Sequence, residues 1–366
     1  MGNDKIKNRV KSGKFLAPSQ KFDQNYDVVV VGYGFAGAVA AISAHDHGAK
    51  VLLLEKMPDL GGISVCAGGG LRLSRDRHAA FEYLKATNAG TTPDDVIQAF
   101  VDGMFELEPY VQELARVNDA TLIRIERPGN YPYPGFESMY FLEVDNVPGF
   151  DRITGYPHAR SLRNGTNMMK VLEDNVVARG IEVRFSTSAE RLISDGDGSI
   201  IGLWTQNEQT GAVSVAASRG VILACGGFEA NAEMQRQYWQ LNPVMTAAFR
   251  GNTGDGIRMA QDVGADLWHM WHFHGSYGFR HPDPAFPFGI RTKRLPDWVP
   301  EYSVTKAQMS WILVDGEGGR FMNEYQPYFQ DTGHRALDVM NPDTQKYPYI
   351  PCYMIVDDRG REMYPL

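Results

Sequence analysis

The chain has 366 residues, 43% of them hydrophobic and 22% charged, which predicts roughly two domains of a soluble globular protein and excludes disorder, collagen and a small disulfide scaffold. Its formal net charge of -8 gives no support for a nucleic-acid-binding surface, and no apolar run approaches the roughly 18 to 20 residues of a membrane span. Only three cysteines occur, without paired spacing, which argues against a cysteine metal knot and favours a reducing, cytoplasmic compartment.

Residues 1–21 form a lysine-rich leader, which we expect to be mobile; the alternative is that the leader is a docking arm. A β-α-β unit is predicted after it. Residues 26–31 contain four successive valines and predict a fully buried strand. Residues 35–47 have apolar side chains at helical spacing, and Gly48 is typical of the residue that ends a helix. Residues 50–55 predict a second buried strand, so this part of the chain begins a parallel sheet.

Helical patterns dominate the middle of the chain, at residues 93–118 and 167–179. A buried strand at residues 219–224 is expected to rejoin the first sheet. The fold class predicted for residues 22–233 is therefore α/β, a Rossmann-like domain with a parallel sheet and a small antiparallel insert. The insert is expected from four short strands with turn glycines between them, at residues 181–185, 191–193, 200–205 and 212–216.

Beyond about residue 233 the chain changes to loops rich in aromatic residues, proline and histidine. Strands are expected there at residues 309–314 and 349–356. We interpret residues 234–366 as a second, capping domain of α+β type. Only ten residues follow its last strand, so we expect this domain to be incomplete.

The run Gly32-Tyr33-Gly34-Phe35-Ala36-Gly37 has the glycine pattern of a dinucleotide-binding turn, and its place between a buried strand and a helix makes the pattern specific. Gly32 allows the tight turn, Gly34 lets the backbone approach a diphosphate, and Gly37 permits close helix packing. The free amides at the start of the helix face the negative charge of the diphosphate. Glu55, at the end of the next strand, is expected to accept hydrogen bonds from the ribose hydroxyls.

A second segment with little side-chain bulk, residues 61–70, can lie directly along an extended ligand. Together with three further motifs, at residues 224–228, 251–256 and 319–324, it makes the chain from about residue 26 onward resemble the flavoprotein superfamily of fumarate reductases, succinate dehydrogenases and 3-ketosteroid dehydrogenases. The resemblance implies bound FAD. The residues that it implies as FAD contacts are Gly32, Gly34, Ala36, Gly37, Glu55, Lys56, Gly62, Ser64, Gly69, Gly70, Ala189, Gly226 and Asp255.

The resemblance also bears on how FAD is attached. In relatives of the complex-II type, a histidine in the second glycine segment bonds covalently to the flavin. This chain has Ile63 and Ser64 there, so we expect non-covalent FAD.

The run Asn323-Glu324-Tyr325-Gln326-Pro327-Tyr328 implies a catalytic residue. Bacterial fumarate reductases have a proton-delivering arginine four places after the glutamate, where this chain has Tyr328. The pattern resembles 3-ketosteroid dehydrogenases instead, in which that tyrosine removes a substrate proton while flavin N5 accepts a hydride. A free phenol has a pKa near ~10 and needs a nearby cation or donor to act as a base, for which Arg320 or His334 are candidates. Packing or substrate contact is the alternative for Tyr328.

Four histidines, interleaved with aromatic residues, allow three interpretations: a metal site, a wall of the active site or ordinary packing. No metal is expected, because the carboxylate or cysteine spacing of a zinc site is lacking. The resemblance places His274 nearest to the family's substrate-side histidine and implies a role in the active site. The four are His269, His272, His274 and His281.

The expected function is that of an FAD-dependent oxidoreductase that forms or reduces a carbon-carbon double bond next to a carbonyl, with a small molecule such as a hydrophobic ketone as substrate. Two alternatives stay open: a reductase of an unsaturated carboxylate, and a flavin-binding subunit completed by a second chain. The family's C-terminal segment, which closes over the flavin, does not follow. Either the polypeptide is truncated or cleaved, or a second polypeptide supplies that piece. The loop at residues 282–300 matches no feature of the steroid enzymes and leaves the substrate open.

Overall fold

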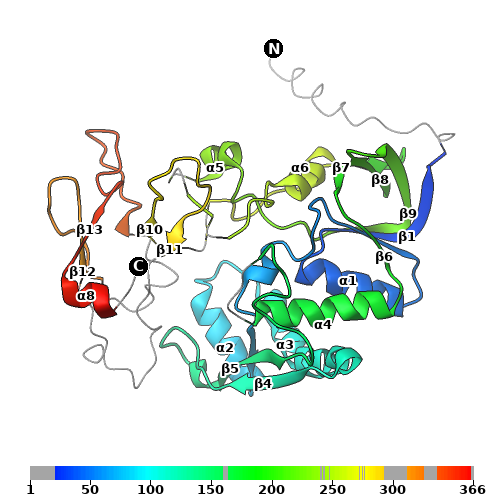
Figure 1. The fold of residues 1–366 in the computed structure, drawn as a ribbon, viewed down its shortest axis with the longest axis horizontal. Coiled ribbons are helices and arrows are strands. Elements are labelled where there is room, and N and C mark those ends of the chain that lie inside the picture. The colour runs from blue at the N-terminus through cyan, green and yellow to red at the C-terminus, as the bar shows by residue number, and fades with distance from the viewer. Residues whose placement is uncertain are drawn as a thin grey trace, which may run out of the picture.

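The fold is built around one six-stranded sheet with the strand order β6-β2-β1-β9-β8-β7 (Figure 1). The computed structural model describes residues 21–159, 164–239, 241, 244–246, 248–271, 273, 275, 277–291, 311–324 and 336–363. The strands of this sheet are β1 (Gln24–Val31), β2 (Val51–Leu54), β6 (Glu182–Arg184), β7 (Thr187–Ser194), β8 (Ile200–Asn207) and β9 (Gly211–Leu223).

The predicted β-α-β unit is confirmed. β1 and β2 pair in parallel, with Val28 opposite Val51 and Val31 opposite Leu54, and α1 (Phe35–Asp46) connects them. The predicted return to the sheet at residues 219–224 is also confirmed, but the two strands expected at 212–216 and 219–224 are one. β9 stays continuous because residues 215–223 pair with β1, while residues 211–216 pair with β8 as part of the antiparallel insert.

Two hydrophobic clusters cover the two faces of the sheet. On one face, Val30 and Leu53 pack with residues of α1 and of α4 (Gly165–Ala178). On the other face, Val29 packs in a cluster with side chains of β7 and β8 and with Met259 of α6 (Asp255–Asp262). Successive residues of β1 therefore point to opposite clusters. Burial on both faces explains why its apolar run has no polar side.

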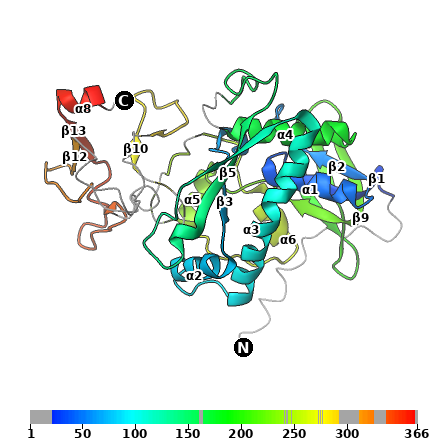
Figure 2. The ribbon, with the colours of Figure 1, turned by 90° about the horizontal axis from the view of Figure 1, so that it is seen from below.

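A second sheet lies in the region where only helical patterns are predicted. Its three antiparallel strands, in the order β3-β5-β4, are β3 (Leu71–Ser74), β5 (Met139–Asn146) and β4 (Thr121–Ile125). The helices predicted at residues 93–118 and 167–179 are confirmed as α3 (Asp94–Ala115) and α4. Both α2 (Arg77–Thr87) and α3 lie alongside this sheet, as Figures 1 and 2 show. Short 3-10 helices occur at Ser64–Cys66, Arg116–Asn118 and Phe136–Ser138.

The last third of the described chain has short elements. We call the described residues between 278 and 363 the distal region, because both views place its labelled strands and α8 at the opposite end of the molecule from β1 and β9 (Figures 1 and 2). Strands are present within the predicted ranges 309–314 and 349–356, as β12 (Trp311–Val314) and β13 (Tyr353–Val356), and residues 309 and 310 lie outside the described residues. Among the described residues no helix is long and apolar enough to cross a membrane. The elements that follow β9, besides α6, are α5 (Ala232–Tyr238), β10 (Gly278–Phe279), β11 (Ile290–Arg291), β12 (Trp311–Val314), β13 (Tyr353–Val356) and α8 (Asp358–Met363).

Candidate cofactor-binding cleft

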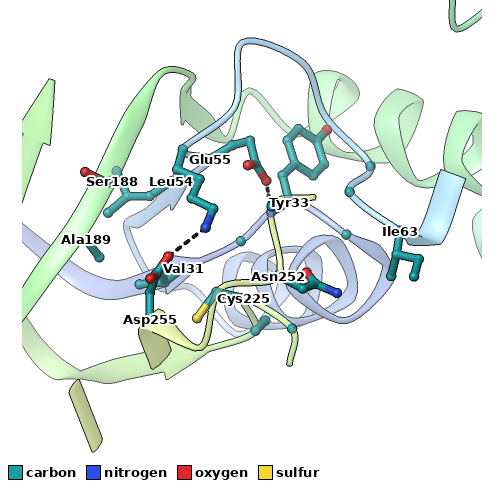
Figure 3. A pocket seen from close by; sticks show the side chains of 18 of the residues that line it. Val31, Tyr33, Leu54, Glu55, Ile63, Ser188, Ala189, Cys225, Asn252 and Asp255 are labelled. Atoms are coloured by element: carbon teal, nitrogen blue, oxygen red, sulfur yellow. Dashed lines mark hydrogen bonds and ion pairs between the residues drawn. The ribbon is translucent and has the colours of Figure 1, made fainter. Parts of the chain in front are cut away.

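A cleft of about 630 Å³, counting the space at its open mouth, crosses the carboxyl ends of β1, β2 and β9. This is the edge of a parallel sheet at which ligands of open α/β folds bind. Figure 3 shows Ala189 and Ser188 at one end of the cleft and Ile63 at the other. The lining residues that the sequence predicts as cofactor contacts are Gly32, Gly34, Glu55, Lys56, Gly62, Ser64, Ala189, Gly226 and Asp255.

The glycines of the first turn allow three close approaches. Gly32 has a φ of +103°, and a Cβ there would lie 2.6 Å from the carbonyl oxygen of Ala224 at the end of β9. A Cβ on Gly37 would lie 1.7 Å from the carbonyl oxygen of Gly32, and one on Gly34 would lie 2.9 Å from Oγ of Ser64. The spacing of the motif is therefore explained by packing: only glycine at these positions lets α1 begin directly at the cleft.

The start of α1 offers unpaired amides to a ligand. The N–H of Phe35 donates to Oγ of Ser64 at 3.1 Å. Backbone amides at a helix start, reinforced by the helix dipole, are a ready-made site for a diphosphate. Among the described residues, the N–H groups without a protein acceptor at this turn are those of Gly34, Ala36 and Gly37.

Glu55 follows β2 directly and is 6% exposed. Its Oε2 accepts a hydrogen bond from the N–H of Tyr33 at 2.9 Å, and its Oε1 accepts one from the N–H of Met57 at 2.9 Å. The carboxylate thus ties the glycine turn to the end of β2. Each carboxylate oxygen has a further lone pair, so the predicted contact with ribose hydroxyls is compatible with these bonds.

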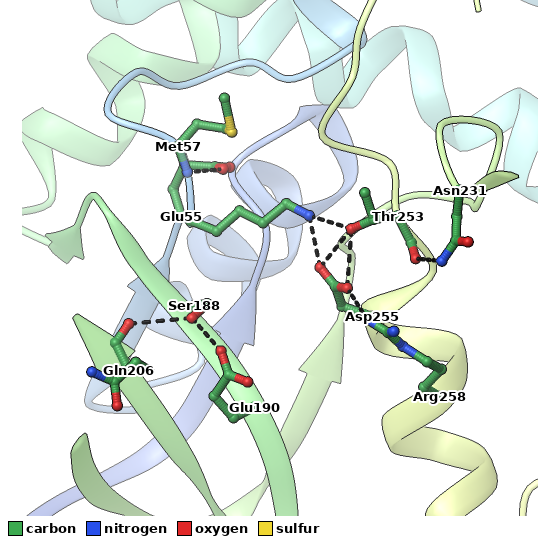
Figure 4. Close-up of polar contacts among 10 residues, drawn as sticks. Glu55, Met57, Ser188, Glu190, Gln206, Asn231, Thr253, Asp255 and Arg258 are labelled. Carbon is green, nitrogen blue, oxygen red and sulfur yellow. Dashed lines mark hydrogen bonds and ion pairs between the residues drawn. The ribbon is translucent and has the colours of Figure 1, made fainter. Parts of the chain in front are cut away.

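A charged cluster at the same end of the cleft joins β2 to α6 (Figure 4). Nζ of Lys56 donates to Oδ2 of Asp255 at 2.7 Å and to Oγ1 of Thr253 at 2.8 Å. Arg258 donates to the other oxygen of Asp255 at 2.6 Å. Burial acts to raise the pKa of Asp255, but the hydrogen bond and charge of Lys56, with the bonds from Thr253 and Arg258, hold this pKa below its ordinary value. Lys56 and Asp255, both predicted cofactor contacts, therefore lie together in the cleft wall.

The second glycine segment passes from the cleft to α4. Gly62 and Ser64 line the cleft, whereas Gly69 and Gly70 lie outside its lining. A Cβ on Gly69, which has a φ of +79°, would lie 2.5 Å from the backbone N of Gly165, and one on Gly70 would lie 3.0 Å from the Phe141 ring. These two glycines bring the segment against α4 and β5. Ala36 and Gly37 likewise lie outside the lining, in the first turn of α1.

Other predicted contacts line the cleft, together with several residues that were not predicted as cofactor contacts. Ala189 lies on β7, and Gly226, with a φ of +75°, packs so closely on Asn252 that a Cβ would lie 2.4 Å from Oδ1 of Asn252. Asn252 belongs to a motif noted in the sequence, so its place was within reach of prediction. Phe249 stands outside every motif and gives no sequence signal. The additional lining residues include Ile63, Thr187, Ser188, Cys225, Phe249, Gly251 and Asn252.

The predicted catalytic residues Tyr328 and His274 lie outside the described residues, as does His334. Arg320, a predicted helper of Tyr328, is described: its guanidinium donates to Glu324, and this hydrogen bond and charge raise the pKa of Arg320. Glu324 is fully buried and also accepts the N–H of Leu313 at 2.7 Å. Arg320 is therefore engaged within the distal region.

The histidine-rich segment provides no described metal site. In the parts of the chain that the structure describes, no three His, Cys, Asp or Glu side chains are grouped so that they could hold a metal ion. His269 stacks on Trp268 with ring centroids 4.4 Å apart. His272 and His274 lie outside the described residues.

The cleft fits a dinucleotide such as FAD. A Cβ at Gly32 would lie within 3 Å of backbone, and a Cβ at Gly34 or Gly226 would lie within 3 Å of the side chain of Ser64 or Asn252, so the walls pack closely because these glycines have no side chain. Free amides at α1 suit a diphosphate, and the lining extends from Ser188 and Ala189 past this turn to Ile63 (Figure 3). Both features were expected from the glycine motifs.

Known proteins show the same family and fold. Residues 27–350 match the sequence family described as FAD binding domain. The NADH:fumarate oxidoreductase of Klebsiella pneumoniae is 31% identical over 331 residues, which cover 87% of this chain and 32% of that protein. The 3-oxosteroid 1-dehydrogenase of Mycolicibacterium smegmatis is 28% identical over 413 residues, covering 93% of this chain and 69% of that protein.

Among solved structures, 3-ketosteroid delta1-dehydrogenase from Sterolibacterium denitrificans has a TM-score of 0.72 at 24% identity, over 94% of this chain and 70% of that one. This likeness shows a shared fold. The chain spans between about a third and a half of the length of the fumarate-reducing relatives that it matches. Since the sequence match extends over the cleft and most of the chain, the protein belongs to the FAD binding domain family, within the superfamily of fumarate reductase and succinate dehydrogenase flavoproteins.

Proposed function

We propose that this protein is an FAD-dependent oxidoreductase that forms or reduces a carbon-carbon double bond next to a carbonyl. The observation that carries the proposal is the cleft beside the start of α1, where glycines line the wall and the amides of Gly34, Ala36 and Gly37 have no acceptor among the described residues, in a chain of the FAD binding domain family. When bound, FAD supplies hydride transfer at its N5 atom. The protein binds and orients the reactants and moves the proton.

We assign the residues of the cleft as follows. The amides of Gly34, Ala36 and Gly37 bind the diphosphate. Glu55 accepts hydrogen bonds from ribose hydroxyls, and the Lys56–Asp255 ion pair fixes the wall beside it. FAD is held without a covalent bond, because Ile63 and Ser64 occupy the cleft where complex-II-type relatives have their flavin-binding histidine.

We assign the proton transfer to Tyr328 and the substrate side of the site to His274, on the sequence resemblance alone. The phenol of Tyr328 removes or returns the proton on the carbon next to the one that exchanges hydride. A Tyr328→Phe protein should keep its flavin and lose most of its turnover. Full turnover in that variant would remove Tyr328 from the mechanism.

The substrate class we favour is a hydrophobic ketone, as in relatives named for 3-oxosteroids. A second candidate is an unsaturated carboxylate, favoured by the 31% identity to a protein named for fumarate and disfavoured by Tyr328 in place of the arginine. The two differ in the direction in which they drive the flavin: a saturated ketone reduces it, and an unsaturated acid oxidises it.

The test uses the full chain reconstituted with FAD. Anaerobic mixing with a 3-ketosteroid should bleach the visible flavin absorbance, whereas reoxidation of the reduced protein by fumarate would support the second candidate. A chain that binds FAD and responds to neither would contradict both. Acid precipitation gives the mode of attachment: flavin in the supernatant is expected, and flavin in the pellet would contradict non-covalent binding.

A further inference from the structure

Asn252 is a buried amide in the wall of the cleft. It is 6% exposed and lines the cleft. In Figure 3 it lies between Cys225 and Ile63, toward the end of the cleft that is opposite Ala189. A polar side chain that is buried without hydrogen-bond partners costs free energy, so each donor and acceptor of this amide needs a partner.

The position of Asn252 is fixed by bonds between two loops, one after β9 and one before α6. The N–H of Ala230 donates to the carbonyl oxygen of Asn252 at 3.0 Å, and the N–H of Gly254 donates to that of Gly227 at 2.9 Å. The side chain is held as well, because Nδ2 of Asn252 donates to Oε1 of Glu229. Both the backbone and the side chain are therefore positioned by the chain itself.

The bond to Glu229 also orients the amide. A carboxylate accepts hydrogen bonds and does not donate them, so the nitrogen of Asn252 faces Glu229 and the oxygen faces away from it. Oδ1 lies against Gly226, which lines the cleft too. Among the described residues, Oδ1 and the second N–H of this amide have no protein partner. Asn252 therefore keeps a free acceptor beside a free donor for a ligand.

A hydroxyl matches this pair of groups, because it both donates and accepts. In the proposed complex the amides of α1 bind the diphosphate of FAD, and Glu55 binds the ribose of its adenosine half. The part of FAD between the diphosphate and the flavin is the ribityl chain, a sugar alcohol. Its hydroxyls follow the diphosphate in the direction of Ile63, the direction in which Asn252 lies.

We propose that Asn252, oriented by Glu229, binds a hydroxyl of the ribityl chain and makes the cleft selective for a dinucleotide that has this chain. The inference rests on the proposed binding of FAD to this cleft. The α1 amides and Glu55 bind the adenosine diphosphate half, which other dinucleotides share, so they do not supply this selectivity. Asn252 contacts the cofactor, and Glu229 is a positioning residue.

The test compares two ligands by titration of the flavin-free chain: FAD, and ADP, which has no ribityl chain. Asn252→Leu keeps the approximate volume of the side chain and removes both hydrogen-bonding groups. It should raise the Kd for FAD by about tenfold or more, while the Kd for ADP changes by less than about three-fold. FAD analogues that each lack one ribityl hydroxyl identify the bonded group: for one of them, wild type and Asn252→Leu should have the same Kd within about two-fold.

Glu229 is tested by rescue with a conservative variant. Glu229→Leu removes the anchor of the amide and should raise the Kd for FAD by about three- to tenfold, whereas Glu229→Gln keeps an oxygen acceptor for Asn252 and should restore the affinity to within about two-fold of wild type. The matched control for the loss of a buried amide is Asn167→Leu. Asn167 is 3% exposed, donates to the carbonyl oxygens of Val144 and Asp145, and does not line the cleft. This variant should be less stable and leave the ratio of the two Kd values unchanged.

Three results would overturn the proposal. Equal losses of FAD and ADP affinity in Asn252→Leu would mean that the residue only supports the cleft, and an unchanged Kd for FAD would mean that it does not contact the cofactor. A loss that is as large for every deoxy analogue as for FAD would mean that the ribityl hydroxyls are bound elsewhere. If circular dichroism shows that Asn252→Leu is unfolded, Asn252→Ala is measured in its place with the same expectations. A wild-type chain that does not bind FAD would contradict the proposed function itself, which is a different result from FAD binding that does not depend on Asn252.

Discussion

The part of the molecule that contains the cleft differs from the distal region in how its residues are buried. In β2, Leu52, Leu53 and Leu54 are all 0% exposed, because helices cover one face of the sheet and the antiparallel strands cover the other. In the two-stranded sheet of β12 and β13, by contrast, Tyr353 and Ile355 are both 54% exposed. A two-stranded sheet with one exposed face gains little from burial.

This difference leads us to expect that the two regions have different roles. The glycine turn at the cleft places Gly32 and Gly37 against backbone carbonyl oxygens, and such close packing does not adjust easily to added atoms. Among the described residues of the distal region, the buried Glu324 accepts a hydrogen bond from the N–H of Leu313. We therefore expect cofactor affinity to depend on the cleft alone, and changes in the distal region to alter its own stability without altering FAD binding.

The largest effect is expected for Gly37→Ala. The new Cβ would lie 1.7 Å from the carbonyl oxygen of Gly32, so α1 must move away from the turn whose amides face the cleft. Overpacking of this kind costs about 1–3 kcal/mol or more, and FAD affinity should fall at least about tenfold, which is about 1.4 kcal/mol. Thermal unfolding and FAD titration measure the two effects.

The same substitution in another helix is the control. Gly103 lies in α3 with open space around its Cβ position. Gly103→Ala should therefore stabilise the chain by about 0.4–1 kcal/mol, because alanine restricts the unfolded chain, and should leave FAD binding unchanged. If both variants bound FAD as tightly as the wild type, the glycine turn would not be the cofactor site.

The next largest effect is expected in the distal region. Glu324→Ala leaves the buried N–H of Leu313 without an acceptor, which costs about 1–3 kcal/mol. Amide hydrogen exchange should accelerate in β12 and β13, while the Kd for FAD changes by less than about three-fold. The partner variant Arg320→Met tests the other half of the pair: it leaves the fully buried carboxylate of Glu324 without its cation, so it should also destabilise the distal region. A large loss of FAD affinity in Glu324→Ala would show that FAD binding depends on the distal region as well as on the cleft.

Much of the first sheet could be predicted from the sequence, because its strands are buried on both faces and leave an unmistakable apolar run, as at residues 28–31 and 51–54. Two of the three strands in the sheet of β3, β5 and β4 gave little signal: Leu71–Ser74 has only four residues, and Thr121–Ile125 has none that is buried. Such strands are defined by their partners rather than by their own composition.

The candidate site, like the fold, could be predicted from the sequence only in part. The glycines and Glu55 were predictable because the diphosphate turn requires them at fixed spacing. Gly69 and Gly70 were assigned to the cofactor, yet their missing side chains are explained by contacts with α4 and β5. Phe249 reaches the cleft from a loop whose path is set by tertiary contacts, such as the bond from Gly289 to Thr246, and no local pattern encodes such a path.

The smallest effect is expected for the ion pair that closes the cleft wall. The pKa of Asp255 is below its ordinary value in the folded chain, so the folded state favours the charged carboxylate. The contribution of the ionised Asp255 to stability, about 1 kcal/mol for a partly buried pair, is therefore fully present above the pKa of the unfolded chain, near ~4. It is lost as pH falls through the pKa of the folded chain.

Urea unfolding should show that the wild type is more stable than Asp255→Asn at neutral pH and that this difference shrinks in acid. Lys56→Met should lower stability at neutral pH by a similar amount, and in the Lys56→Met background Asp255→Asn should cost less than it does in wild type. A difference between wild type and Asp255→Asn that stays constant into strong acid would mean that the carboxylate's charge does not hold α6 to β2, and that this wall, like the rest of the cleft, depends on backbone packing.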